Sequence, residues 1–218
     1  MKINLGCGTD IKEGYLNLDI EPFEVVRKKA SELQGRELSN LGYQQLDLDV
    51  YPYPFEDNSI DEILAFGVIE HIKDYRRCIE ELKRILKVDG VIHIKVPHFT
   101  CAGSNSEFHK TRFWYHSFTA NRLRKSQRTS GEASGLYDDF EQIGKKKINF
   151  VKGFLFWNYL IEPLINLHPF VSVLYEHTFI CYLFPASEIE VELKKLHEEN
   201  IKNDKYDADA HANCYPGY

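Results

Sequence analysis

The sequence predicts an α/β fold built on a mostly parallel sheet, and two patterns support this prediction. Five apolar or alternating runs, typical of strands, follow one another through the first hundred residues. Before the fifth run, Tyr75–Leu86 carries apolar residues at three- and four-residue steps, the pattern of an amphipathic helix. Because strands separated by helical segments favour parallel pairing, we expect helices on both faces of the sheet.

The predicted strands of this first part are Ile3–Leu5, Tyr15–Ile20, Gln44–Val50, Ile60–Phe66 and Val91–Val96. The turn Val88-Asp89-Gly90 is predicted to end the helix before the last of these strands. Only six residues separate Gly8 from Tyr15, which is too few for a full crossover helix. The first connection is therefore expected to contain about one turn of helix at most.

The pattern changes after Pro97. Residues 98–146 are rich in His, Ser, Arg and Lys with aromatic residues between them, and regular structure resumes at Lys147–Phe156 and Glu188–Leu196. The aromatic stretch between these two segments has three interpretations: packed core, a homodimer contact, or a surface resting on lipid. We assign residues 1–196 to one domain, with 98–146 as an insertion at the acceptor site, and 197–218 to a polar C-terminal tail.

Composition narrows the class of protein. The chain has 218 residues, 43% hydrophobic and 28% charged, which is typical of a soluble globular protein. Because its net charge is −6, we do not expect the protein to bind nucleic acid with its whole surface. Five scattered cysteines without a Cys-x-x-Cys pair favour a reducing compartment over a zinc ribbon or a disulfide framework. No signal peptide or membrane-spanning run of about 18 apolar residues is found, so we expect a cytoplasmic protein.

A candidate nucleotide site begins at the first strand. Gly6-Cys7-Gly8 follows that strand, and glycine allows both a sharp turn and a close approach of the backbone to a ligand. Asp19 stands at the end of the second strand, where an acid can accept two hydrogen bonds from a ribose diol. Asp47 and Asp49 end the third predicted strand, and either could hold an adenine amino group or cap a turn.

Five segments in this order resemble the class I S-adenosylmethionine-dependent methyltransferases. More narrowly, they are similar to the small bacterial and archaeal type-11-like members, often found among surface-glycan or other biosynthetic genes. The segments are Asn4–Gly8, Gly14–Ile20, Asp47–Leu48 with Tyr53–Asp61, Val68–Ile72 and Leu86–Val91. Four later segments resemble the second half of the family's sequence: Val96–Phe99, His109–Phe113, Trp157–Leu164 and Tyr182–Ala186.

This resemblance implies a Rossmann-like seven-stranded sheet whose last strand pair, near 147–155 and 188–195, includes an antiparallel strand. It implies S-adenosylmethionine as the cofactor, with the backbone of the glycine turn along its methionine portion. The ribose would lie on Asp19, the adenine on Asp47 and Leu48, and the sulfonium near the end of the fourth strand. The implied cofactor residues are Gly6, Cys7, Gly8, Asp19, Ile20, Asp47, Leu48, Gly67 and Val68.

Three histidines are candidate general bases, since histidine titrates near neutral pH. His98 follows the fifth strand, His71 follows the fourth, and His109 lies in the insertion at a position that resembles a recurring family position. Each has the alternative of a structural histidine that packs or hydrogen-bonds inside the protein. His98, His109 and His116 match no specific zinc spacing, so no metal site is predicted.

The insertion also carries a run of positive charge without any acid, made by Lys110, Arg112, Arg122, Arg124, Lys125 and Arg128. Aromatic residues lie between these charges, and a charge of +6 on a chain of net −6 suggests an anionic partner. We therefore predict that the acceptor is bound by Lys110, Arg112, Trp114 and Tyr115. The alternative is a solvated loop with aromatic anchors; RNA is disfavoured because the patch is short.

The predicted function is methyl transfer to a small biosynthetic hydroxyl acceptor, anionic (phosphorylated) or sugar-like. One alternative is a non-catalytic binding or partner subunit, in which the shortened first connection disables cofactor uptake. The other is a nicotinamide-dependent oxidoreductase, which would use the same sheet and Asp19. It is disfavoured because Gly6-Cys7-Gly8-Thr9 lacks the third glycine and the helix that a pyrophosphate needs.

Overall fold

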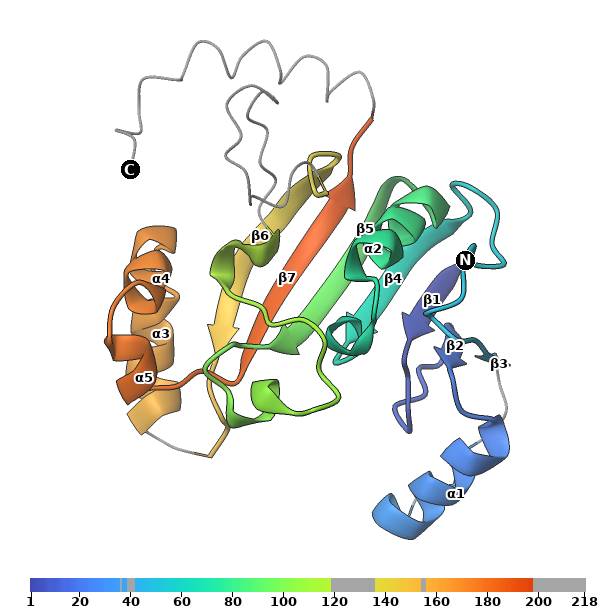
Figure 1. Ribbon diagram of the computed structural model, residues 1–218, viewed down its shortest axis with the longest axis horizontal. Helices are drawn as coiled ribbons and strands as arrows, with labels where there is room; N and C mark the ends of the chain where they lie inside the picture. Colours follow the sequence, from blue (N-terminus) through green and yellow to red (C-terminus); the bar gives the residue numbers. More distant parts are fainter. Residues whose placement is uncertain (36, 39–41, 119–135, 154–155, 198–218) are drawn as a thin grey trace.

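The computed structural model describes residues 1–35, 37–38, 42–118, 136–153 and 156–197. Seven strands form one sheet in the order β3-β2-β1-β4-β5-β7-β6 (Figure 1). The strands are β1 Lys2–Leu5, β2 Leu16–Asp19, β3 Tyr43–Gln45, β4 Ile60–Phe66, β5 Leu86–Pro97, β6 Phe140–Asn149 and β7 Glu188–Lys195. The first five pair in parallel, and β7 runs antiparallel to both of its neighbours. The predicted seven-stranded, mostly parallel sheet is confirmed.

The described helices are α1 Phe23–Gln34, α2 Tyr75–Ile85, α3 Glu162–Ile165, α4 Pro169–Glu176 and α5 Ile180–Leu183. Shorter turns are η1 Ile69–His71, η2 Ala102–Asn105, η3 Tyr115–Phe118 and the π-helical η5 Trp157–Ile161. Helix α2 is the amphipathic helix that the sequence predicts. Asp74 caps it by accepting the backbone N–H of Arg77 at 3.0 Å, which satisfies one of the free donors of the first turn.

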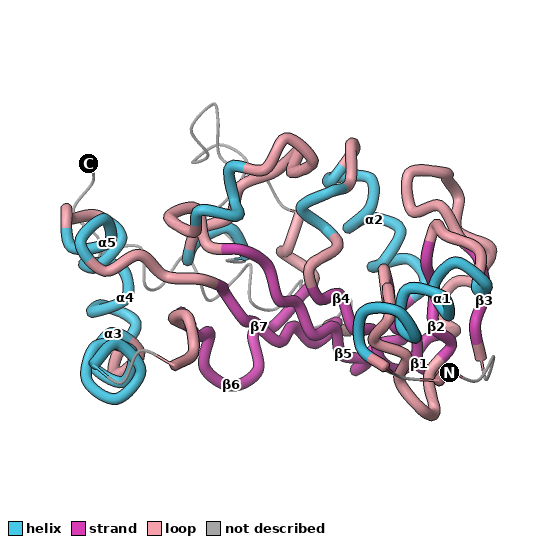
Figure 2. The backbone as a smooth tube through the Cα atoms, turned by 90° about the horizontal axis from the view of Figure 1, so that it is seen from below, coloured by secondary structure: helices cyan, strands magenta, loops and turns pink. Residues whose placement is uncertain are grey.

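The main core lies between one face of the sheet and α2, which Figure 2 shows above the strands. Every second residue of β5 and β7 is buried on this face: Ile92, Ile94, Val96, Ile189, Val191 and Leu193. The buried side of α2 consists of Cys78, Ile79, Leu82 and Ile85. The buried residues of each strand are two positions apart, and those of α2 recur at one- and three-residue steps along one face of the helix. These are the spacings that place side chains on one face of a strand and of a helix.

The opposite face of β4, β5 and β7 is more polar than the core face. It carries partly exposed charged side chains, and His93 lies 3.6 Å from Glu62 and 3.3 Å from Glu192. Lys95 lies 3.9 Å from both Glu188 and Glu190. The strands alternate apolar with charged residues, which is typical of a sheet with one solvated face.

Several strand boundaries also differ from the prediction. β3 ends at Gln45 because the chain then turns, with the Val50 N–H donating to the Asp47 carbonyl. β5 begins directly after α2, and the predicted turn at Val88-Asp89-Gly90 is an irregularity inside the strand with Asp89 at a φ of +62°. β6 spans 140–149 instead of 147–156; its register with β7 shifts near polar residues at the sheet edge, where hydrophobic alternation is weak.

The connection from β1 to β2 contains no helix, as the sequence predicted. At the other end of the sheet, a second core joins β6 to η3 and to the turns and helices of residues 157–184. Only part of the aromatic stretch is packed there, since nine of its large apolar side chains are exposed. None of the described helices is long and apolar enough to cross a membrane. The four described cysteines are free, and Cys214 and the predicted tail from residue 198 lie outside the described residues.

Candidate cofactor and active site

The turn after β1 depends on two glycines in the left-handed region, Gly6 at a φ of +55° and Gly8 at +48°. A Cβ on Gly6 would lie 2.3 Å from Cγ2 of Val68, so the chain after β1 passes directly against the chain after β4. A Cβ on Gly8 would meet no protein atom within 4 Å. Glycine is therefore needed at the first position for space, and at the second mainly for its backbone conformation.

Asp19, at the end of β2, holds this turn in place. The Gly8 N–H donates to its Oδ2 at 2.8 Å, and the Glu21 N–H donates to its Oδ1 at 3.1 Å. A carboxylate can accept about four hydrogen bonds, so both oxygens retain lone pairs for a ligand. The neighbouring Cys7 is buried, and burial together with the charge of Asp19 raises the pKa of its thiol to about 12. The Cys7 side chain is therefore a neutral, packed group.

The end of β3 lies next to Asp19, since the Leu46 N–H donates to the Asp19 carbonyl at 2.8 Å. Asp47 caps the following turn, with Oδ1 accepting the Asp49 N–H at 2.9 Å. Leu48 is buried in the main core. Ile20 is 59% exposed on the other side of Asp19. The structure thus brings the ends of β1, β2 and β3 together, and it shows the turn-capping role that was the alternative for Asp47.

The end of β4 adds a group of ionisable side chains. Gly67 has a φ of +63°, and Val68 and the single turn η1 follow it. Glu70 is 2% exposed, and burial raises the pKa of its carboxyl to about 7. The rings of His71 and His109 meet edge to face with centroids 4.7 Å apart. The ligand atoms of all three side chains lie within 4.8 Å of one another.

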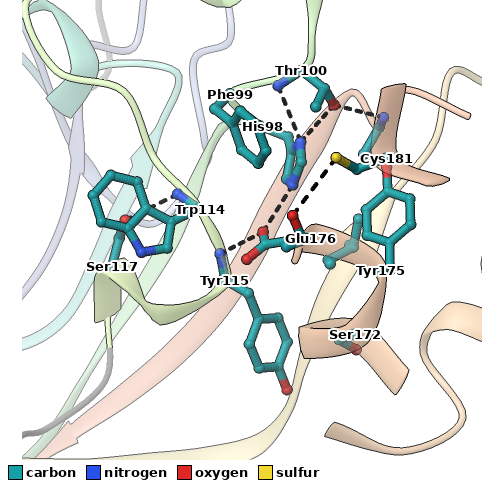
Figure 3. A network of polar contacts seen from close by, with 12 residues as sticks. His98, Phe99, Thr100, Trp114, Tyr115, Ser117, Ser172, Tyr175, Glu176 and Cys181 are labelled. Carbon is teal, nitrogen blue, oxygen red and sulfur yellow. Dashed lines mark hydrogen bonds and ion pairs between the residues drawn. The ribbon is translucent and has the colours of Figure 1, made fainter. Parts of the chain in front are cut away.

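His98 lies apart from that group, in a buried network (Figure 3). Its Nε2 is 2.9 Å from Oε1 of Glu176, on α4. Its Nδ1 accepts the Thr100 backbone N–H at 3.2 Å and lies 2.7 Å from the Thr100 hydroxyl. Because the ring is fully buried and both nitrogens have protein partners, this geometry matches the structural alternative for His98.

The predicted acceptor residues fall into two groups. Lys110 and Arg112 are exposed and Trp114 is 50% exposed, so all three can reach a ligand. Tyr115 is buried in the second core, where its N–H donates to Oε1 of Glu176 at 2.7 Å. The Lys146 ammonium lies 4.7 Å from the centre of the Tyr115 ring. The remaining members of the basic run, Arg122, Arg124, Lys125 and Arg128, lie outside the described residues.

Sequence reasoning missed three buried ionisable residues: Glu70, Glu176 and Lys146. Glu70 had a usable signal, because it directly precedes His71 at the end of a predicted strand. Glu176 also had one, as one of only two acids, with Glu162, within the apolar stretch 157–184. Lys146 had none, because it belongs to a run of three lysines and only the tertiary structure buries it.

Comparison with known proteins gives a consistent result. Residues 3–94 match the family described as "Methyltransferase domain". The YcgJ protein from Bacillus subtilis has a similar structure, with a TM-score of 0.52, 16% identity, and coverage of 90% of this chain and 92% of that one. An S-adenosylmethionine-dependent methyltransferase from Mesorhizobium loti has a TM-score of 0.50, 14% identity, and coverage of 89% and 90%. No curated protein matches the chain.

A third similar chain comes from the complex of the Haloferax volcanii Trm112 methyltransferase activator with a methyltransferase. Its TM-score is 0.51, with 16% identity and coverage of 90% of this chain and 82% of that one. At these identities the structural matches show the fold alone. The protein therefore has the Rossmann-like fold of class I S-adenosylmethionine-dependent methyltransferases. The sequence similarity to the methyltransferase-domain family is confined to residues 3–94, less than half of the chain.

Proposed function

We propose that this protein is an S-adenosylmethionine-dependent methyltransferase that methylates a hydroxyl of a small anionic or sugar-like acceptor. One observation carries the proposal: the Gly6–Gly8 turn is hydrogen-bonded to Asp19 and packs against Val68, where β1, β2 and β4 end. In open α/β sheets, ligands bind outside the carboxyl ends of the strands.

The residues present fit the cofactor. The backbone at Gly8 faces open space, and Asp19 retains lone pairs for the two ribose hydroxyls. Oδ2 of Asp47 would accept from the adenine amino group, with the exposed Ile20 covering the adenosine. Gly67 and Val68 would lie near the sulfonium. When bound, S-adenosylmethionine supplies an electrophilic methyl group for an in-line displacement.

The acceptor hydroxyl must lose its proton as it attacks. We infer that His109 is the base, because burial and the neighbouring His71 lower its pKa and so favour the neutral form that can accept a proton. His71, on the same site, can share the proton. A positioned base contributes about 10²–10⁴ in rate. His98 would act only by holding the loop after β5, since its ring is fully buried.

The acceptor itself would lie near the exposed side chains of Lys110 and Arg112, which follow His109 in the chain. Their charges favour a phosphate or carboxylate, and the half-exposed Trp114 offers a ring for a sugar face. A screen of phosphorylated and sugar-containing compounds, read by release of S-adenosylhomocysteine, would identify the class. The Lys110→Glu variant would lower turnover of an anionic acceptor and leave cofactor binding unchanged.

The first test is calorimetric titration with S-adenosylmethionine and S-adenosylhomocysteine, with NADH as the negative control. We expect micromolar binding of both sulfur ligands and none of NADH. Asp19→Ala should abolish binding, whereas Asp57→Ala should not, because Asp57 is an exposed acid that pairs with Arg84. Wild-type protein that is folded by circular dichroism and binds neither ligand would contradict the proposal.

The shortened connection between β1 and β2 supports a second candidate, a non-catalytic partner subunit of the same fold. The similar Haloferax volcanii structure is a complex of a methyltransferase with an activator protein. This candidate predicts no binding of either sulfur ligand by the folded chain alone. The nicotinamide alternative remains disfavoured, because residues 6–15 contain no helix to hold a pyrophosphate.

A further inference from the structure

We propose that Glu70, His71 and His109 form a binding site for a divalent transition-metal ion of the zinc type. The three side chains come from η1 and from the insertion after β5, and their ligand atoms lie within 4.8 Å of one another. They meet just beyond Gly67 and Val68, at the end of β4. The spacing of His98, His109 and His116 in the sequence did not predict this site, because two of its three ligands, Glu70 and His71, lie elsewhere in the chain.

The chemistry of these three side chains determines which kind of ion the site would bind. Two imidazoles and one carboxylate are the ligands of catalytic zinc sites and of non-haem iron sites. Magnesium is disfavoured, because it prefers oxygen ligands and keeps several waters. Three protein ligands leave at least one coordination position open for water or for an acceptor oxygen.

Glu70 is an independent sign of a ligand. Its side chain is 2% exposed, and within the described part of the chain its Oε2 has no hydrogen-bond partner. A buried carboxylate oxygen without a partner is costly, and most such atoms in proteins are paired. The charge of Glu188, another acid, also raises the pKa of Glu70, so it adds to the cost of ionising the buried carboxyl. A bound cation would offset both charges.

The histidines need only small movements to bind one ion. Donors in a tetrahedral zinc site lie roughly 3.3 Å apart, given bonds of about 2.0–2.1 Å. His71 is exposed and His109 is half-buried, so both rings can rotate towards Glu70. His71 Nδ1 lies 3.3 Å from the Phe108 carbonyl. A backbone carbonyl on one ring nitrogen is the usual way to orient the other nitrogen towards a metal.

The backbone also holds the two segments together. The Lys110 N–H donates to the Glu70 carbonyl at 2.7 Å, and the Thr111 N–H donates to the same oxygen at 3.3 Å. The insertion is therefore bonded to η1 directly beside His109. This contact keeps His109 near Glu70 whether or not the side chains bind an ion, as a prepared site requires.

The chemical role of this ion depends on the proposed function, although metal binding itself does not. With an ion bound, His71 and His109 would be ligands and no longer free bases. An acceptor hydroxyl on the open position would instead lose its proton to solvent, because a metal-bound oxygen has a lowered pKa. The oxygen would then bond to the methyl carbon as the carbon–sulfur bond breaks. The electron pair of that bond stays on sulfur, which gives neutral S-adenosylhomocysteine.

The test is titration of chelator-treated full-length protein with Co²⁺, followed by its visible absorption, and with Zn²⁺ in competition with a chromophoric chelator. No cofactor is added. We expect one ion per chain and at least tenfold weaker binding in both His71→Ala and Glu70→Gln. His197→Ala is the matched control, since that exposed histidine pairs with Asp89 away from the site. Mg²⁺ in place of Zn²⁺ should not compete.

Folded wild-type protein that takes up no ion, or variants that bind as tightly as the wild type, would overturn the proposal. Glu70→Gln preserves the size of the side chain, so it tests the site even if His71→Ala is unstable. Asp19→Ala separates the two proposals: it should lose S-adenosylmethionine and still bind Co²⁺. Loss of metal binding alone, with the cofactor retained, would leave the proposed function standing.

Discussion

At the scale of single residues, the site depends on backbone space as much as on side-chain chemistry. Gly6 and Gly8 both have positive φ values, but their surroundings differ. Gly6 faces Val68 at a distance that no real Cβ could occupy, whereas Gly8 faces open space. The two glycines of one short motif therefore serve different purposes, namely packing of β1 against β4 and access for a ligand.

We expect Gly6→Ala to lower the free energy of unfolding by about 2–4 kcal/mol, because overpacking adds to the cost of a left-handed backbone. Gly8→Ala should cost about 1 kcal/mol, since only the backbone term applies. Urea unfolding of the two variants measures the difference. Adding Val68→Ala to Gly6→Ala should recover part of the loss. Equal losses in the two single variants would contradict the packing argument.

Glu70 gives a prediction about pH. Its carboxyl has a pKa of about 7 when folded, against 4.5 for an unperturbed group, so the folded state binds the proton more tightly. In metal-free protein, stability should therefore fall as pH rises from 4.5 to about 7, by up to about 1 kcal/mol per pH unit from this group. Urea unfolding with a chelator present measures it, and Glu70→Gln should lack this part of the decrease. Parallel pH profiles for the two proteins would contradict it.

At the scale of elements, a buried network joins the end of β5 to η3 and α4. Oε1 of Glu176 interacts with both His98 and the N–H of Tyr115, and Thr100 accepts the Ala186 N–H at 3.0 Å (Figure 3). These contacts link four segments that lie far apart in the chain. The second core is therefore attached to the sheet through polar bonds as well as apolar packing.

We expect His98→Ala to lower the free energy of unfolding by about 3–5 kcal/mol, because it leaves the Glu176 carboxylate buried without its partner. His109→Ala, at a half-buried position, should cost about 1 kcal/mol or less. Chemical unfolding of both variants is the measurement. A small effect at His98 would show that its ring is not structural and would restore it as a candidate base.

At the scale of the whole molecule, the two ends differ in character. The proposed cofactor residues lie at the carboxyl ends of β1 to β4, whereas η5 to α5 lie at the far end of the molecule (Figure 1) and carry many exposed apolar side chains. We define this apolar end by its exposed side chains: Phe156, Tyr159, Leu160, Leu164, Leu167, Phe170, Leu174, Phe179, Tyr182 and Leu183. Many exposed apolar side chains on one group of helices often mark an interface.

We predict that the protein self-associates through the apolar end. Sedimentation velocity should show a concentration-dependent dimer, and Leu164→Lys combined with Phe179→Lys should shift the protein to monomer. Leu33→Lys is the control, because Leu33 is equally apolar and 79% exposed but lies on α1, at the opposite end of the molecule (Figure 1). A wild-type protein that stays monomeric at high concentration, or a double variant that still dimerises, would refute this prediction.

Much of the fold, and the glycine turn of the candidate cofactor site, could be predicted from local sequence. Apolar spacing predicted α2 and the core-facing residues of β5, and the short distance from Gly8 to Tyr15 predicted a first connection without a full helix. The extent of β6 could not be predicted, because a polar edge strand is defined by pairing and not by hydrophobic alternation. The alternation of apolar and polar residues in Val91–Val96 predicted that one face of β5 is polar.

The sequence by itself determined the class of fold and the glycine turn with Asp19, because both depend on residues close together in the chain. Only the tertiary structure decided the surroundings of the histidines. It buried His98 against Glu176, and it brought His109 beside Glu70 and His71. Contacts between distant segments depend on how the insertion packs on the sheet, and no local pattern of residues specifies that packing.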